Sequence, residues 1–578
     1  MSWNVQAVAV DYDGTLTHND VPDMAVLDAL RAARVGGRVV VLVTGRILSE
    51  LRTVFPGVDQ EFDAIVAENG AVLADADGVR NLAAPVDPTL GQVLAQREIT
   101  VQQGRVLLAC DSRHAATVFD ELMRLGIDGQ VVRNRGALMV LPSGVTKGSG
   151  LVRALGNLGI SRHSTLGVGD AENDHQLLAS CELGAAVANA VPALKQRADL
   201  VLDQPDGAGI IELLTGPVMA GTRRLPPRHW QLQLGHDADR NPVRVPASQQ
   251  NLLLTGGSCS GKSYLAGLLV EQLVRLDYSV LVLDREGDHH SLGDRRGILA
   301  VGGTQRLPTA QELTALLRHR FGSVVVDLSQ HDELAQQAYL AEVMPSVLAQ
   351  RAVTGLPHWL VLEEAHSLLV DPHPWRGLAD QMSGLCLSTY RPDALPTMVR
   401  DELDLFVLSA GGGDGSASAT TFVAEQTGWP EHRLTAPLTD SPRGRALLVR
   451  RDGPPTDFTV GPRSSSHVRH WHKYIESELP PSYRFYFEPH AHGRVAANLR
   501  EFHRHLGGCP AEWIERHARH HDFSSWIRAV LQDLELAQHI AVAERSLQFD
   551  DRSVEEVRDA IRDAIEHRYL EESPPPPL

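Results

Sequence analysis

A glycine-rich loop near the middle of the chain constrains the fold more than any other stretch. The pattern G-x-x-x-x-G-K-S/T is met at Gly256, Gly261, Lys262 and Ser263. An apolar run over 251–254 leads into the loop, and a helical pattern over 264–276 follows it. In a strand–loop–helix context, backbone N–H groups at the helix N-terminus can cradle phosphate groups. The sequence therefore predicts an α/β nucleotide-binding domain around this loop.

Length and composition set the outer limits. A chain of 578 residues exceeds one ordinary hydrophobic core and predicts three or four domains. No apolar run reaches the roughly 20 residues of a membrane span, and no signal peptide is evident, so we expect no membrane partner. The five cysteines are scattered and odd in number, which predicts reduced thiols in the cytoplasm. The net charge of -18 argues against a surface that coats nucleic acid broadly, but a local basic pore lining stays compatible with it.

A second set of polar residues follows apolar runs in the N-terminal part of the chain. Asp11 and Asp13 end the run that begins at Val8, and residues two apart in a strand lie on the same side. Such a pair suits an aspartate nucleophile beside a general acid/base. Alone, it could also form a calcium-binding loop or a turn, which is the less favoured interpretation. The later members of the set are Thr44, Lys147, Asp170, Asn173 and Asp174.

These four clusters, in the order Asp/Asp, Thr, Lys and Asp/Asn/Asp, resemble the haloacid dehalogenase (HAD) superfamily. Their spacing resembles its Cof-type branch, and the short cap resembles that of archaeal-type phosphoglycolate phosphatases. The resemblance implies a Rossmann-like α/β domain over 1–215, with a core over 1–76 and 143–215 and an α+β cap over 77–142. It also implies that a small phosphate ester is the substrate and that the cap selects it.

The same resemblance assigns roles to the residues. Asp11 would be the nucleophile that forms an aspartyl-phosphate, and Asp13 would be the general acid/base. Thr44 and Lys147 would hold the phosphoryl oxygens. Mg²⁺ would be held by Asp11, the backbone carbonyl of Asp13, Asp170 and Asp174, with Asn173 helping to orient the site. Carboxylate and phosphate oxygens suit this ion, which would offset repulsion between Asp11 and the incoming phosphate.

The glycine-rich loop belongs to a predicted domain over 251–465, which follows a linker and β-hairpin over 216–250. The residues expected to contact ATP are Gly256, Gly257, Ser258, Cys259, Ser260, Gly261, Lys262, Ser263 and Tyr264. Lys262 would reach the β- and γ-phosphates, and Ser263 would bind Mg²⁺. The strand predicted before Glu363 and Glu364 would be the Walker B strand. We expect Glu363 to face the metal, in a place where Asp is usual, and Glu364 to be the catalytic base.

Three segments, 284–288, 362–366 and 389–392, resemble the HerA/FtsK-like ATPases. The resemblance implies a RecA-like fold, self-association into a hexameric ring and, commonly in that family, action on DNA. Tyr390 departs from the usual Gln before Arg-Pro. Arg391, Arg443 and Arg445 are either fingers that reach a neighbouring subunit or ordinary surface arginines. A small-molecule kinase is the alternative, disfavoured because Glu363 comes about a hundred residues after the loop.

The region 466–578 predicts a small, mostly helical module. A basic and aromatic segment over 463–474 is either a linker helix or a contact for phosphate or acidic partners. A short strand is expected over 483–487, and apolar spacing of three and four predicts amphipathic helices after it. The histidines at 503, 505, 517, 520 and 521 could supply metal ligands, but solvated helix faces explain them better.

Three functions fit this organisation. The favoured one is a bifunctional enzyme, in which an Mg²⁺-dependent phosphatase is fused to an oligomeric ATP-hydrolysing motor. The second is a nucleic-acid translocase or remodelling ATPase whose HAD domain acts on nucleotides or nucleic-acid ends. The third is an assembly scaffold that binds ATP and presents the phosphatase, and Glu363 in the Walker B place motivates it.

Overall fold

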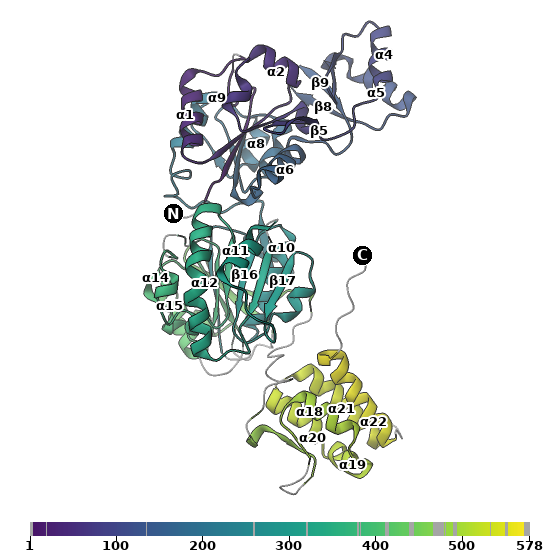
Figure 1. Cartoon of the computed structure of the whole chain (residues 1–578), viewed down its shortest axis with the longest axis vertical. Coiled ribbons are helices and arrows are strands. Elements are labelled where there is room, and N and C mark those ends of the chain that lie inside the picture. The colour runs from purple at the N-terminus through teal and green to yellow at the C-terminus, as the bar shows by residue number, and fades with distance from the viewer. Residues whose placement is uncertain are drawn as a thin grey trace.

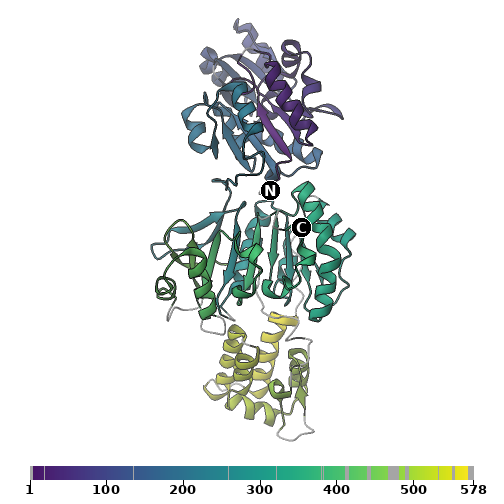
Figure 2. The same ribbon diagram turned by 90° about the vertical axis from the view of Figure 1, so that its left-hand side faces the viewer.

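The computed structural model describes most of the chain, and it forms three bodies in chain order (Figure 1). The described residues are 4–18, 20–134, 136–257, 260–319, 322–378, 381, 383–410, 416–438, 444–465, 475, 479, 481–488, 494–531, 533–549 and 553–570. Turning the molecule keeps the second body between the other two (Figure 2). Within the described part, no helix is long and apolar enough to cross a bilayer.

The N-terminal domain is built on an eight-stranded sheet in the order β12-β11-β10-β1-β2-β3-β4-β5. Its parallel strands are β1 (Ala7–Asp11), β2 (Val39–Val43), β3 (Ala64–Ala67), β10 (Thr165–Gly169), β11 (Leu183–Ala186) and β12 (Leu200–Val201). These strands are nearly continuous apolar runs, as expected of a parallel sheet covered on both faces. The covering helices are α1 (Met24–Val35), α2 (Leu48–Val54), α3 (Val58–Glu61), α6 (Lys147–Leu158), α7 (His175–Ala179), α8 (Pro192–Arg197) and α9 (Asp206–Thr215).

A separate cap is inserted between β5 and α6 (Figure 1). It has its own four-stranded antiparallel sheet and its own hydrophobic core. Its elements are α4 (Pro88–Gln96), β6 (Gln102–Gln103), β7 (Leu108–Asp111), α5 (Ala115–Leu125), β8 (Gln130–Asn134) and β9 (Ala137–Leu141).

The cap begins later in the chain than the sequence predicted, because one hairpin belongs to the core sheet. Residues 78–81 were assigned to the cap, but β4 (Val72–Asp75) and β5 (Gly78–Asn81) pair antiparallel at the edge of the core sheet. The physical reason is that β4 is a buried apolar strand and β5 pairs with it through a tight turn.

The second domain has an eleven-stranded sheet in the order β14-β13-β23-β22-β21-β15-β20-β19-β16-β18-β17. The parallel strands are β15 (Asn251–Thr255), β16 (Val280–Asp284), β17 (Ile298–Gly302), β18 (Ser323–Asp327), β19 (Trp359–Leu362), β20 (Leu385–Thr389) and β21 (Leu405–Ser409). The principal helices are α10 (Lys262–Arg275), α11 (Ala310–Arg318), α12 (Glu333–Thr354) and α15 (Ser416–Thr427). Apolar cores lie on both faces of the sheet.

Two expectations about the borders of this sheet need correction. The hairpin predicted within 216–250 is present as β13 (Gln231–His236) and β14 (Pro242–Pro246), but it was placed ahead of the second domain, whereas it pairs with β23 (Thr456–Val460) and extends that domain's sheet. The apolar run over 444–449 predicts a late strand at the edge of the sheet; it forms β22 (Arg445–Arg450), which lies between β21 and β23. The hairpin was misplaced because its partner β23 comes more than two hundred residues later, and β22 was misplaced because β23 pairs on its far side.

The C-terminal module is mostly helical, as predicted, and has its own core. A two-stranded sheet of β24 (Phe485–Tyr486) and β25 (Val495–Ala496) precedes the helices. The helices are α18 (Leu499–Gly507), α19 (Ala511–Arg519), α20 (Asp522–Trp526), α21 (Leu534–Phe549) and α22 (Val554–Ile565). Residues 466–474, most of the predicted basic segment, lie outside the described residues.

A buried carboxylate joins the first two domains. Glu182 is fully buried and accepts hydrogen bonds from the Tyr278 hydroxyl at 2.8 Å and from the Ser248 hydroxyl. Its third partner is His163 Nδ1, at 2.8 Å. Because Tyr278 and Ser248 come from the second domain and its hairpin segment, the two domains share one satisfied polar network.

Candidate functional sites

Three carboxylates meet at the C-terminal edge of the first sheet. Asp11 ends β1, Asp170 directly follows β10, and Asp174 lies in the short η4 turn (Glu172–Asp174). β1 and β10 are parallel neighbours, so their ends converge. A carboxylate oxygen from each of the three lies within 4.8 Å of the others, and all three residues are buried. Hard oxygen donors in this arrangement fit Mg²⁺.

Lys147 provides the cation of this cluster. It is the first residue of α6, which Thr146 caps by accepting from the Ser149 backbone N–H. Its Nζ is buried and donates to Asp11 Oδ1 at 2.5 Å and to Asp174 Oδ1 at 2.6 Å. Burial lowers the pKa of Lys147, but the two carboxylates outweigh it and raise the pKa above its usual value. The lysine therefore stays charged.

At Asp11, the effects that favour the neutral form of the carboxyl group outweigh the effect of Lys147. Burial raises its pKa well above the usual value, and the charge of Asp174 raises it further, while Lys147 lowers it. A nucleophilic carboxylate must be ionised, and a nearby cation favours that form. A divalent ion among these acids would thus support Asp11 in that role.

Thr44 and Asn173 lie where the sequence predicted polar groups at the strand ends. Thr44 is fully buried just after β2, and its hydroxyl accepts from the Arg46 backbone N–H at 3.1 Å. Asn173 donates through Nδ2 to Asn69 Oδ1 at 3.3 Å. Asn69 was not singled out from the sequence, although it lies in the Glu-Asn-Gly segment at the end of β3.

Asp13 lies apart from the three-acid cluster and is held by an arginine that sequence reasoning missed. Arg46 Nη2 donates to Asp13 Oδ1 at 2.6 Å, and Arg46 Nε donates to Asp13 Oδ2 at 2.9 Å. The same guanidinium reaches Asp20 at 2.6 Å. The position of Arg46 two residues after Thr44 was the available signal, because residues just beyond a strand end face the same crevice.

Glu68 ties the core of the N-terminal domain to the cap. Its buried carboxylate accepts backbone N–H bonds from Arg105, Val106 and Leu107 at 2.8–3.1 Å. Gly70 follows with a φ of 106°, and a Cβ there would lie 1.9 Å from the Thr146 carbonyl oxygen. The turn therefore requires glycine to press against the start of α6 and Lys147.

The glycine-rich loop forms the second site, at the N-terminus of α10. Lys262 Nζ donates to the Gly257 carbonyl at 2.9 Å, so its ammonium points into the loop. Ser263 Oγ donates to Glu363 Oε2 at 3.5 Å, which links the loop to the Walker B strand. Ser258 and Cys259 lie outside the described residues. Tyr264 instead turns its hydroxyl to accept from the Arg463 backbone N–H at 2.9 Å.

Glu363 has a buried partner that sequence reasoning did not identify. His289 Nε2 donates to Glu363 Oε1 at 2.8 Å, and both side chains are buried. Asp284 shapes the preceding turn by accepting N–H bonds from Gly287, Asp288 and His289. His289 thereby fixes one oxygen of Glu363 and leaves the other facing Ser263.

Glu364 follows in a left-handed conformation with a φ of 48°. Burial, and then repulsion from Glu286 and Glu363, raises its pKa to about 8, although Lys262 lowers it in part. Its Oε2 lies 3.3 Å from His366 Nδ1, which also lies 2.9 Å from the Thr389 hydroxyl at the end of β20. A carboxylate with a pKa near neutrality is suited to accept a proton from water.

The structure narrows the choice among the three arginines that could reach a neighbouring subunit. Arg445 forms an ion pair with Asp457 on the adjacent strand β23, so this arginine is engaged within its own sheet. Arg391 is exposed, and Arg443 lies outside the described residues.

The histidines of the C-terminal module contact different partners. His503, His517 and His521 pair with Glu566, Asp522 and Glu544 at 3.2, 2.7 and 3.2 Å. Over the described ranges, Asp11, Asp170 and Asp174 form the one group of three or more side chains that could hold a metal.

Comparison with known proteins finds a related family for each of the first two domains. Residues 8–86 and 105–214 match the family of haloacid dehalogenase-like hydrolases, and residues 248–314 match the central domain of helicase HerA. A phosphoglycolate phosphatase of Methanothermobacter thermautotrophicus is 32% identical over 217 residues, which are 36% of this chain and 96% of that protein. One of Archaeoglobus fulgidus is 31% identical over 229 residues, 36% of this chain and 95% of that protein. A crystal structure of a Thermoplasma acidophilum protein covers 36% of this chain and 96% of its own at 18% identity and a TM-score of 0.33.

Proposed function

The chain belongs to the haloacid dehalogenase-like hydrolases through its N-terminal domain, and we propose that this domain hydrolyses a small phosphate ester through an aspartyl-phosphate on Asp11. The observation that carries the proposal is the position of Lys147, whose ammonium lies between Asp11 and Asp174 beside Asp170. The buried site thus combines the proposed nucleophile, Asp11, with the fixed ammonium group of Lys147 and the carboxylates of Asp170 and Asp174.

The chemistry follows from these positions. Asp11 attacks the phosphorus atom, and Asp13 gives a proton to the oxygen of the leaving alcohol. In the second half-reaction, Asp13 takes a proton from water, the water oxygen attacks the phosphorus, and Asp11 is released with inorganic phosphate. Thr44 and Lys147 bind phosphoryl oxygens. Mg²⁺, held by Asp11, Asp170, Asp174 and the Asp13 carbonyl, would supply positive charge against the negative charge that the phosphoryl group carries.

Phosphoglycolate is the first substrate to test, because the matched relatives are phosphoglycolate phosphatases. Release of phosphate from phosphoglycolate and from a panel of sugar phosphates would be measured with Mg²⁺. The Asp11→Asn variant should lose at least about 10³-fold in kcat, because it lacks the nucleophile. Asp120→Asn, an exposed change on α5 of the cap, is the matched control and should retain activity. Equal activity of Asp11→Asn and the parent protein would exclude the assignment.

For the second domain we propose ATP binding and hydrolysis that drives an oligomeric motor. The support is the arrangement of Lys262 and Ser263 in the loop, Glu363 held by His289 opposite Ser263, and Glu364 beside them. ATP turnover that is present in the parent protein and lost in Glu364→Gln would support hydrolysis over a pure scaffold. The molecular mass in solution, with and without ATP and Mg²⁺, tests the ring.

A translocase acting on nucleic acid is the alternative that the HerA similarity brings. It predicts that DNA or RNA stimulates ATP hydrolysis at low salt, with the effect falling as salt rises. Hydrolysis unaffected by either polymer would remove this alternative. A cytoplasmic location is proposed as well, supported by the four described cysteines, which are all buried and unpaired.

A further inference from the structure

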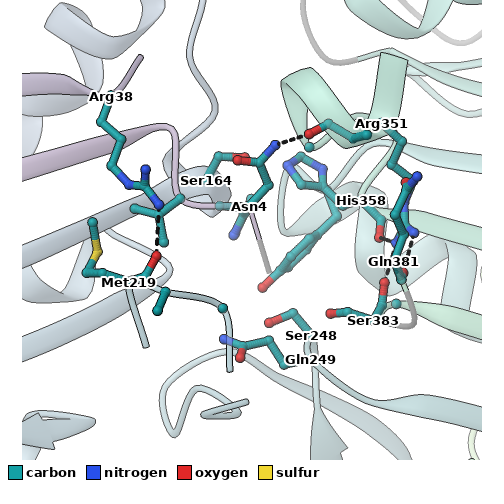
Figure 3. A pocket seen from close by; sticks show the side chains of 18 of the residues that line it. Asn4, Arg38, Ser164, Met219, Ser248, Gln249, Arg351, His358, Gln381 and Ser383 are labelled. Carbon is teal, nitrogen blue, oxygen red and sulfur yellow. Dashed lines mark hydrogen bonds between the residues drawn. The ribbon is translucent and has the colours of Figure 1, made fainter. Parts of the chain in front are cut away.

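A cavity lies between the first two domains (Figure 3). Its volume is about 400 Å³. The N-terminal domain contributes Asn4 and Arg38, the segment after β14 contributes Gln249, and the second domain contributes Arg351 and His358. No residue assigned above to phosphatase or ATPase chemistry lines it.

The walls of this cavity present buried N–H donors that lack partners among the described residues. Gln249 is 1% exposed, and its Oε1 accepts the Leu225 backbone N–H at 2.8 Å, which leaves Nε2 unpaired. His358 Nδ1 accepts the Ser279 N–H at 2.8 Å, so the neutral ring carries its proton on Nε2, which is also unpaired. Arg38 Nε is a third such donor. A buried donor without a partner is unfavourable, and an acceptor on a ligand would remove that cost.

The arginine side chains that line the cavity give it positive charge. Arg38 and Arg351 lie on opposite sides of the cavity (Figure 3), and no Asp or Glu is among the described residues that line it. Arg351 donates to the backbone carbonyls of Pro357, His358, Gln381 and Ser383. Burial lowers its pKa to about 10, so it remains a cation at neutral pH. An anionic ligand would meet favourable potential from both sides.

The cavity wall also presents one hydrogen-bond acceptor. Gln381 donates through Nε2 to the Leu348 carbonyl at 3.1 Å, and its buried Oε1 has no partner within the part of the chain that the structure describes. A ligand that satisfies the cavity therefore carries acceptor oxygens and at least one donor, such as a hydroxyl. A phosphomonoester of a sugar or of a nucleoside has this combination. Pockets of about 300–1,000 Å³ are typical for ligands of this size.

We propose that this interdomain cavity binds a small hydroxylated phosphomonoester, a nucleoside monophosphate or a sugar phosphate. The ligand touches both domains, so it favours their docked arrangement and links its concentration to the stability of the junction. This inference is independent of the proposed activities, because it uses none of their residues.

The test uses the full chain with Asp11→Asn and Lys262→Ala, which disable the other two phosphate sites. Calorimetric titration with AMP, ribose 5-phosphate and inorganic phosphate should show one ligand per chain for AMP, ribose 5-phosphate or both. Adding Gln249→Glu keeps the acceptor for Leu225 and replaces the free donor by a negative oxygen, so it should weaken binding at least tenfold. Gln96→Glu, an exposed change of the same charge on α4, should leave binding unchanged.

AMP and ribose 5-phosphate distinguish the two classes of ligand. Binding of AMP alone indicates a nucleoside monophosphate, and binding of ribose 5-phosphate indicates a sugar phosphate. Arg38→Met is the second cavity variant, and its effect on ligand binding tests the proposal if Gln249→Glu does not fold. Binding of inorganic phosphate only, binding of no probe, or binding equal in the parent and in the folded cavity variant would overturn the proposal.

Discussion

His163 Nε2 lies 2.7 Å from the backbone carbonyl oxygen of Leu276, which caps the C-terminal end of α10. Arg162 donates to the same carbonyl at 3.2 Å and pairs with Asp277 at 2.6 Å, so a guanidinium faces the negative end of the helix dipole. α10 begins at Lys262 in the glycine-rich loop, and β10, two residues after His163, leads to Asp170. One helix and one strand therefore lead from this contact to the two phosphate sites.

The junction should depend on Glu182. Glu182→Ala removes the common acceptor of His163, Tyr278 and Ser248 and leaves buried donors unpaired. Breaking a buried network of this kind costs about 3–5 kcal/mol, which corresponds to a fall of about 10 °C in the first thermal transition. Calorimetry of the full chain measures it, with the exposed Glu50→Ala on α2 as control. Equal transitions for the two variants would show that the network does not hold the domains.

Metal removal should stop the phosphatase. Excess EDTA should abolish phosphate release, and added Mg²⁺ should restore it, because three acids converge beside Lys147. Thr15, whose hydroxyl donates to Asp170 Oδ1 at 3.3 Å, orients one of these acids. Thr15→Val should raise the Mg²⁺ concentration for half-maximal activity about tenfold. The exposed Thr53→Val should not change it, and EDTA-resistant activity would contradict the metal site.

The ATPase should depend on His289. His289→Leu removes the donor that fixes Glu363 Oε1 and should lower kcat for ATP hydrolysis about 10- to 100-fold, because the glutamate loses its orientation. A positioning role also predicts a higher Mg²⁺ requirement, which a purely structural role would not produce. His290→Leu changes the exposed neighbour and serves as control. Similar ATPase rates in both variants would argue against the assignment.

The rate of ATP hydrolysis should rise with pH. Burial and neighbouring acids raise the pKa of Glu364 from 4.5 to about 8, and a base acts only when ionised. kcat/KM for ATP, which reports groups of the free enzyme, should therefore fall about tenfold per pH unit below this value and level off above it. Initial rates between about pH 6 and 9.5 test this. A profile that is flat from pH 6 upward would show that Glu364 is ionised throughout or is not the base.

The predicted fold class is confirmed, because long apolar runs specify strands and the parallel strand ends gather polar side chains. Asp11, Lys147 and Asp170 could be found in this way, since each ends a strand, directly follows one or begins a helix. Arg46, just beyond the end of β2, was open to the same reasoning, whereas Asn69 and His289 lie in turns whose conformation depends on tertiary contacts. Asn69 has a φ of 56°, and the next residue, Gly70, lies against the start of a helix more than seventy residues later in the chain.

The borders of the sheets were predicted less well for a related reason. Local patterns predict β22 and the hairpin of β13 and β14 as strands, but they do not show that β23 pairs with both and joins them in one sheet. The strand β5 is exposed and polar and resembles a loop in sequence, so its pairing with β4 could not be inferred. The cavity at Gln249 was equally invisible, since it is assembled from three separate regions of the chain.

The hairpin of β13 and β14 determines how this protein can be divided into working pieces. It enters the sheet next to a strand that comes more than two hundred residues later, and Gly235 lies so close to Thr459 that a Cβ would sit 1.9 Å from its carbonyl oxygen. A cut at residue 250 therefore removes two strands and leaves β23 as a bare edge open to aggregation. The smallest piece that keeps the second sheet whole begins ahead of Gln231, within the segment that sequence alone assigns to a linker.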